Sequence, residues 1–180
     1  STYLLVDDFE SYTDDEGNRI YESWIDGWTN ATGSVVGNLV APFAERTIVH
    51  SGRQAMPVDF DNTKAPFYSE AEREFAPVQD WTVNGVKVLT LFVCGVATNQ
   101  AEPFYVALED KAGKVGVVTS TNTALLTKAE WTEWKIPLTS FTGVNAAAVK
   151  TISVGVGSRT SPKAGGIGKL YLDDIRVVKP

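Results

Sequence analysis

The sequence predicts an all-β protein, a two-sheet antiparallel β-sandwich of the jelly-roll type with few short helical turns. Three observations support this prediction. Apolar residues alternate with a period of two in many short segments, turn residues separate these segments, and helical periodicity is scarce. Hydrophobic residues make up 43% and charged residues 21% of the 180 residues, as in globular proteins. No Pro- or Ser-rich linker divides the chain, so residues 1–180 are expected to form one domain.

The expected strands follow one another along the whole chain. In residues 86–96, Leu89, Leu91 and Val93 share one side of the strand, and Thr90 and Phe92 the other. The same alternation predicts further strands at 2–9, 34–40, 46–50, 53–61, 67–75, 104–110, 113–120, 133–138, 150–157 and 169–178. Helical turns are expected only at 77–82, 125–131 and 144–151. About ten strands in this length favour a jelly roll over a smaller immunoglobulin-like sandwich.

Composition and charge exclude several classes of protein. The net charge is −6 and no basic stripe is present, so neither nucleic acid nor an anionic membrane surface is an expected partner. No apolar run approaches the ~20 residues of a membrane-spanning helix. The single cysteine, Cys94, is expected to be a buried free thiol, and the single histidine, His50, excludes a zinc site with several His or Cys ligands. Because the chain starts at Ser1 without a signal peptide, it is expected to be a segment of a mature or larger protein.

Carboxylates at the two ends of the chain indicate a metal site. The first expected strand ends in VDDFE, which contains Glu10, and the last contains YLDDI, which contains Asp173. First and last strands of jelly rolls often lie side by side, and carboxylates brought together repel unless a cation joins them. Calcium suits such a site, with a carbonyl from the turn at 50–53 as a further ligand. The alternative is that these are solvated strand-end charges that protect a sheet edge.

Several motifs together carry a resemblance to a known family. In order along the chain they are VDDFESY, VHSGRQAM, DWT, EWTEWKIPLTSF and GKLYLDDIRV. This pattern resembles the galactose-binding-like jelly-roll carbohydrate-binding modules appended to secreted bacterial polysaccharide-degrading enzymes, over nearly the whole chain. The resemblance implies a non-catalytic module that targets an attached enzyme to a plant or algal polysaccharide. It also implies a secreted or cell-surface protein with covalently attached catalytic or anchoring domains.

The resemblance further implies a structural calcium ion with a defined ligand set. The side chain of Glu10, the backbone carbonyl of Arg53, the side chain and carbonyl of Asp173, and the carbonyl of Asp7 are the expected ligands. Such an ion would hold the two chain ends against the turn at 50–53 and take no part in chemistry.

A carbohydrate site needs flat aromatic rings beside polar side chains, because a ring buries much area at little entropic cost. Trp81, Trp131 and Trp134 are expected in structural positions. Trp24 and Trp28, in a polar and Gly-rich segment at 23–30, are expected either to form a platform or to plug one end of the sandwich. The remaining candidates for the same groove, each with an alternative role as an ordinary strand residue, are Asp61, Asn62, Tyr68, Arg73, Phe92 and Tyr105.

Catalysis is not expected, although two alternatives to a binding module stay open. Glu70, Glu72 and Glu74 alternate on one strand face and are the best candidates for the carboxylate pair of a small jelly-roll glycoside hydrolase or lyase. No nucleophile elbow or phosphate loop is present. The other alternative is a spacer or adhesion domain of a large extracellular protein that binds another protein. An exposed aromatic platform distinguishes a binding module from such a spacer.

Overall fold

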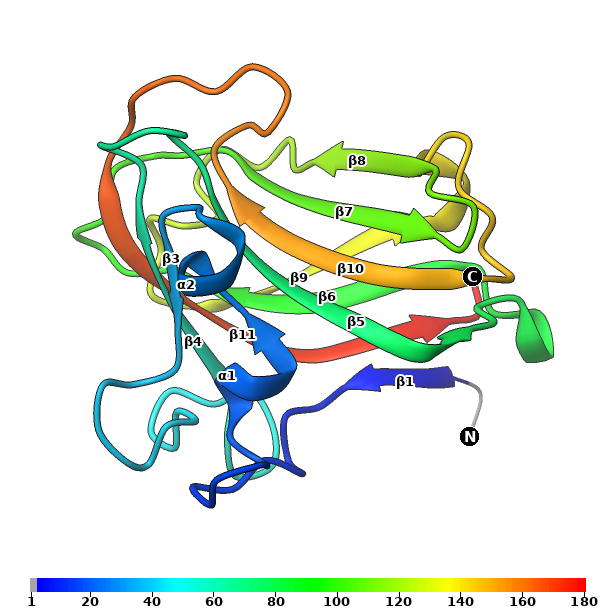
Figure 1. Cartoon of the computed structure of the whole chain (residues 1–180), viewed down its shortest axis with the longest axis horizontal. Coiled ribbons are helices and arrows are strands. Elements are labelled where there is room, and N and C mark those ends of the chain that lie inside the picture. Colours follow the sequence, from blue (N-terminus) through cyan, green and yellow to red (C-terminus); the bar gives the residue numbers. More distant parts are fainter. Residues whose placement is uncertain (1–2) are drawn as a thin grey trace.

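The computed structural model describes residues 3–180 and shows two antiparallel sheets packed face to face (Figure 1). The six-stranded sheet, sheet A, has the order β3 (Ser34–Val36), β4 (Met56–Asp61), β11 (Ile167–Val178), β6 (Val88–Cys94) and β9 (Trp131–Pro137), with β1 (Tyr3–Asp7) also paired to β11. The five-stranded sheet, sheet B, has the order β2 (Trp24–Ile25), β5 (Ser69–Gln79), β10 (Val149–Val156), β7 (Phe104–Asp110) and β8 (Val115–Thr119). The predicted all-β sandwich is confirmed.

Helical structure is limited to short segments. The two α-helices, α1 (Ile20–Ser23) and α2 (Gly27–Asn30), have four residues each, and two 3₁₀ turns span Val83–Gly85 and Leu138–Ser140. The helical turns expected at 125–131 and 144–151 are non-helical turns that lead into β9 and β10. Within residues 3–180, no helix is long and apolar enough to cross a membrane.

The core lies between the sheets and follows the predicted alternation. Leu89, Leu91 and Val93 of β6 are fully buried in one hydrophobic cluster with the inward residues of the other strands. Each such side chain contributes about 1.5–3 kcal/mol by leaving water. Cys94 is a buried free thiol, as expected, and burial raises the pKa of that thiol.

The segment 46–50 was expected to be a strand, but it is an irregular loop. Its backbone amides are bound by carboxylates instead of by a neighbouring strand. Thr47 N donates to Glu45 Oε2 at 2.9 Å, and His50 N donates to Asp173 Oδ2 at 3.0 Å. Side-chain acceptors of this kind compete with a β-ladder for the same amides.

The first and last strands lie side by side, as the jelly-roll prediction requires. β1 pairs with β11 in antiparallel fashion, and Tyr3 stands opposite Val178. Figure 1 shows β1 and the end of β11 at one side of the sandwich, while α2 and β3 lie at the other.

Candidate functional site

The residues expected to line one sugar-binding groove do not come together in one place. Trp24 and Arg73 converge on a buried carboxylate, Asp7, which accepts hydrogen bonds from Trp24 Nε1 at 2.9 Å and Arg73 Nη1 at 2.8 Å. The hydroxyl of Tyr12 donates to the same oxygen at 2.6 Å. Burial and the adjacent Asp7 raise the pKa of Tyr12 far above its ordinary value. Trp24 is fully buried, so it plugs the sandwich and offers no stacking platform.

Phe92 lies on the outer face of sheet A, but its ring is already covered. The imidazole of His50 stacks on it with ring centroids 3.6 Å apart and an interplanar angle of 18°. His50 is held there because its Nδ1 lies 2.7 Å from Asp174 Oδ2. The expectation of an open aromatic at Phe92 is therefore corrected: the loop at 46–54 occupies that position.

Tyr105 faces outward from sheet B, yet only 1% of it is exposed. Its hydroxyl donates to Glu70 Oε1 at 2.5 Å, and Arg159 Nε donates to the same oxygen at 2.6 Å. Burial, and then the charge of Glu70, raise the pKa of Tyr105 far above its ordinary value. Tyr105 is therefore held inside the fold by its hydrogen bond to Glu70 and offers no open ring to a ligand.

The carboxylates of β5 are not arranged as an unpaired catalytic couple. Glu70 is bound by Arg159 and Tyr105, as described above, whereas the Glu72 side chain lies on the same outer face and has no hydrogen-bond partner among residues 3–180. Burial raises the pKa of Glu72, and the charges of Glu70, Glu109 and Glu74 add to this effect. The outer face of β5 therefore carries three glutamates, of which Glu70 is paired with Arg159.

Asn62 and Tyr68 have structural positions in the β4–β5 connection. Asn62 is 1% exposed; its Oδ1 accepts from Ser69 Oγ at 2.6 Å, and its Nδ2 donates to the Val156 carbonyl at 3.1 Å. Tyr68 is half-buried, and its carbonyl accepts from Gly33 N at 3.0 Å. Asn62 therefore ties the β4–β5 connection to the end of β10 and is not available to a ligand.

Trp28 is the expected aromatic that is open to solvent, with 90% of its surface exposed. The local sequence fixes the backbone that carries it. Asp26 caps α2 by accepting from Trp28 N at 3.1 Å, and its other oxygen accepts from Val36 N at 2.8 Å, which ties α2 to β3. Gly27 is required because a Cβ there would collide with the carbonyl oxygens of Thr32 and Ser34. The helix ends at Ala31, which has the left-handed φ of 61°.

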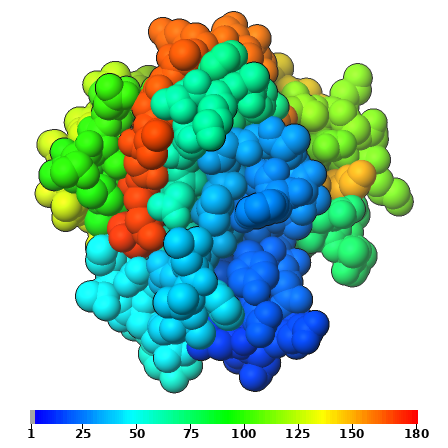
Figure 2. Space-filling model, turned by 60° about the vertical axis from the view of Figure 1, so that its left-hand side comes forward, coloured from blue at the N-terminus to red at the C-terminus, as the bar shows by residue number. Residues whose placement is uncertain are grey.

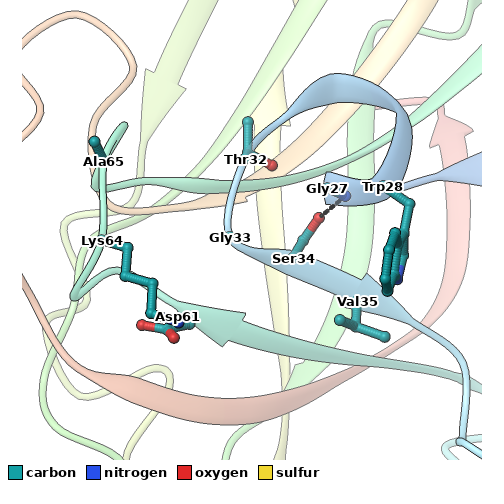
Figure 3. Close-up of a pocket in the computed structure, with 9 residues that line it drawn as sticks. All are labelled: Gly27, Trp28, Thr32, Gly33, Ser34, Val35, Asp61, Lys64 and Ala65. Atoms are coloured by element: carbon teal, nitrogen blue, oxygen red, sulfur yellow. Dashed lines mark hydrogen bonds between the residues drawn. The ribbon is translucent and has the colours of Figure 1, made fainter.

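Trp28 borders a cavity of about 350 Å³ between α2, β3 and the β4–β5 loop, and Asp61 lines the same cavity. Figure 3 shows the indole beside Val35, with Asp61 and Lys64 across the cavity. Asp61 Oδ1 accepts from Thr63, which lowers the pKa of the carboxyl. Asp61 Oδ2 has no hydrogen-bond partner among residues 3–180 and is free to accept from a ligand.

Sequence reasoning found Trp28 and Asp61 but missed Lys64 and Val35. Lys64 is far from Trp28 in the sequence, and no local pattern marks either residue as its neighbour. The antiparallel pairing of β3 with β4 brings them together, since Ser34 stands opposite Phe60 and Val35 opposite Asp59. Val35, Asp59 and Asp61 then project from the same outer face of sheet A.

The expected calcium ligands separate into two groups. The carboxylate of Asp7 is occupied by the donors described above, while its carbonyl, the expected ligand atom, stays a prediction. Glu10 accepts from Arg53 N at 2.8 Å and from Gln54 N at 3.1 Å, while Asp173 Oδ2 accepts from His50 N and Ser51 N at 3.0 and 3.2 Å. Both chain ends therefore hold the loop at 50–54.

The donor set at this loop suits calcium only if backbone carbonyls take part. Within residues 3–180, no three His, Cys, Asp or Glu side chains surround a common position for an ion. Asp173 is fully buried, and burial raises the pKa of its carboxyl to about 7. The contacts of Asp173 and Glu10 in this loop are backbone amides, and with backbone carbonyls added these carboxylates would form a donor set that Ca²⁺ accepts.

The sandwich has the jelly-roll fold of the carbohydrate-binding modules to which the sequence motifs pointed. No protein-family model and no curated protein sequence matches the chain. Among solved structures, a family 11 carbohydrate-binding module from Clostridium thermocellum, in complex with a β-1,3-1,4-mixed-linked tetrasaccharide, is similar with a TM-score of 0.61 and 16% identity. The match covers 99% of this chain and 96% of that one.

Two further structures show the same fold. A family 30 carbohydrate-binding module matches with a TM-score of 0.57 and 14% identity, over 82% of this chain and 83% of that one. An exo-β-agarase matches all of this chain with a TM-score of 0.68 and 11% identity, but the match covers only 26% of the agarase. The fold therefore occurs both as a separate module and as one part of a longer enzyme chain.

Proposed function

We propose that this protein is a non-catalytic carbohydrate-binding module that binds polysaccharide at the cavity beside Trp28. The observation that carries the proposal is the position of Trp28, whose side chain is 90% exposed on a backbone held by the Asp26 cap. A pyranose ring stacked on the indole would cover apolar surface that water now contacts, and the indole would lose little entropy because it has only two rotatable side-chain bonds. Asp61 would accept hydrogen bonds from sugar hydroxyls, and Lys64 would donate to them.

The biological role that we propose is targeting. The module would hold a covalently attached enzyme close to a plant or algal polysaccharide in a secreted or cell-surface protein. Tethering raises the effective concentration of substrate without any new catalytic contact. The match of this fold to about a quarter of an exo-β-agarase chain supports such an arrangement.

We also propose that one structural calcium ion binds at the loop at 50–54. Glu10 and Asp173 would supply side-chain oxygens, and Arg53 a backbone carbonyl. The support is that both carboxylates already contact this loop and that the Asp173 carboxylate is fully buried. The ion would offset the cost of burying that charge and add no chemistry.

A second candidate function is a spacer or protein-binding domain. It is favoured by an apolar patch next to Trp28, where Leu39 is 88% and Val40 75% exposed. Contiguous apolar surface of this kind also marks protein interfaces.

Affinity electrophoresis distinguishes the two candidates. The protein is run through gels containing cellulose derivatives, xylan, mannan, β-glucans, pectin or algal glucans. We expect one polymer to retard the wild-type protein, the Trp28→Ala variant to migrate as in an empty gel, and the melting temperature to stay the same. Val115→Ala, which removes a 45% exposed side chain on sheet B, is the matched control and should be retarded like the wild type. Absence of retardation by every polymer would favour the spacer.

A further inference from the structure

Trp28 borders a second cavity, of about 380 Å³, in addition to the one that contains Asp61. Both cavities share Trp28 and Val35. The first is lined by residues 32–35, at the start of β3, and the second by residues 35–39, at its end. The cavities therefore follow one another along the edge strand, and Trp28 stands at the point where they meet.

The second cavity has aromatic and polar groups of its own. Tyr21 and Phe43 pack edge to face, with centroids 5.3 Å apart. Asn38 is fixed in place because its Nδ2 donates to the Pro42 carbonyl at 3.2 Å and its Oδ1 accepts from Lys169 Nζ at 3.4 Å. Leu39 is 88% exposed beside them. Each side of Trp28 thus offers apolar surface together with a polar side chain.

The two cavities together are longer than one sugar ring. Together they run from Gly33 before β3, past Ser34–Val36, to Leu39 after it. Figure 2 shows the blue α2–β3 segment between the blue-green β4–β5 loop above it and the cyan segment that follows β3 below it. A ligand that lies along β3 would therefore pass from Lys64, across Trp28, to Asn38.

The charges around this surface are balanced. Asp61 and Lys64 lie together at one end, and Lys169 Nζ lies 3.8 Å from Asp59 further along the same face. The protein as a whole carries a net charge of −6, which disfavours a strongly anionic chain. A neutral glycan fits this surface better than a polyuronate or a sulfated polymer.

We propose that the two cavities are the halves of one groove that binds an internal stretch of a neutral, unbranched glycan chain, with Trp28 beneath the central sugar. This inference rests on the proposed function, since it assigns a ligand class to the same tryptophan. Binding of a chain end would need only one of the two cavities. Binding along the chain uses both.

The test is calorimetric titration with cello-, xylo-, manno-, laminari- and agaro-oligosaccharides of one to six sugars. The variants are Asp61→Ala for the first cavity, Asn38→Ala and Leu39→Ala for the second, and Trp28→Ala for the shared platform. Asp15→Ala, at an exposed aspartate in the loop before α1, is the control. Melting curves establish whether each variant is folded. If Asn38→Ala does not fold, Leu39→Ala alone tests the second cavity.

We expect affinity for one series to rise about tenfold or more from the disaccharide to the longer oligosaccharides. Asp61→Ala and the second-cavity variants should each lower the affinity for the hexasaccharide by roughly three- to tenfold, the loss of one hydrogen bond or apolar contact. The groove is refuted if a mono- or disaccharide binds as tightly as the hexasaccharide, or if both Asn38→Ala and Leu39→Ala bind the hexasaccharide like the wild type. The proposed function would survive that result if Trp28→Ala still abolished binding. Retention by pectin alone would overturn the neutral ligand class, and an unchanged affinity of Trp28→Ala would overturn both proposals.

Discussion

Hydrogen bonds within the protein already occupy several of the side chains that were expected to bind a ligand. Asp7 was expected to offer its backbone carbonyl to a metal, which stays a prediction, and the donors Tyr12, Trp24 and Arg73 surround its carboxylate. The sequence shows a carboxylate beside a β-strand, and it does not show that a tryptophan 17 residues away turns inward to meet it. Trp24 and Trp28 lie in the same short segment and have opposite environments, because Trp24 belongs to β2 and Trp28 to the exposed surface of α2.

Replacement of Asp7 by alanine is expected to lower the free energy of unfolding by about 3 kcal/mol or more, because it leaves a guanidinium, an indole and a phenol without their acceptor. Urea denaturation followed by Trp fluorescence measures the change. Asp15→Ala, at an exposed aspartate, is the control and should alter stability by less than about 0.5 kcal/mol. A loss of the same small size for Asp7→Ala would contradict a central role for this carboxylate.

At the scale of elements, the sequence predicts the strands well and the connections poorly. The alternation in β6, β7, β10 and β11 fixes which side chains enter the core, and that part of the prediction is confirmed. The segment 46–50 has the same apolar character but no strand forms, since Glu45 and Asp173 bind its amides. The pairing of β3 with β4, which brings Lys64 to Trp28, is a long-range contact that no local pattern shows.

The acidic row on β5 gives a prediction on pH. Burial and neighbouring carboxylates raise the pKa of Glu72 in the folded protein, so the fold favours the protonated form. Its contribution to stability is therefore present below the unfolded pKa of about 4.3 and is lost as the pH rises through the folded pKa. Glu72→Gln has nearly the shape of the protonated glutamate and carries no charge. It should raise the free energy of unfolding by roughly 0.2–1 kcal/mol at pH 7 to 8.

The advantage of Glu72→Gln should disappear at pH 3.5, where the wild-type side chain is already protonated. Melting curves of both proteins across this pH range measure the difference. Glu16→Gln, at an exposed glutamate in the loop before α1, is the control and should show no such dependence on pH. A constant difference between Glu72→Gln and the wild type at every pH would contradict the electrostatic explanation.

At the scale of the whole molecule, the two ends of the chain and the loop at 50–54 form one structural unit. Glu10 follows β1, Asp173 belongs to β11, and both accept hydrogen bonds from this loop. The sequence predicted that these segments would meet. It did not predict that backbone amides would supply so many of the contacts, because those amides become available only where the loop departs from a strand.

Removal of calcium is expected to lower the melting temperature by roughly 5–10 °C, because an ion present at about 100 times its dissociation constant contributes about 2.7 kcal/mol. Differential scanning calorimetry with excess chelator, followed by addition of calcium, measures the change. In Glu10→Gln the difference between chelator and calcium should become much smaller, while Asp15→Ala should behave like the wild type. A melting curve that chelator leaves unchanged would refute the calcium proposal.

The pairing of β1 with β11 also determines how this sandwich responds to mechanical load. Tyr3 and Val178 stand opposite each other in an antiparallel pair, and the Arg176 guanidinium lies 4.5 Å from the Tyr3 ring centroid. Tension applied between these two ends acts across the strands, so it opens the interstrand hydrogen bonds one pair after another and not all at once. The first event under tension would be the peeling of β1, while the Trp28 surface, at the far side of the sandwich, keeps its shape.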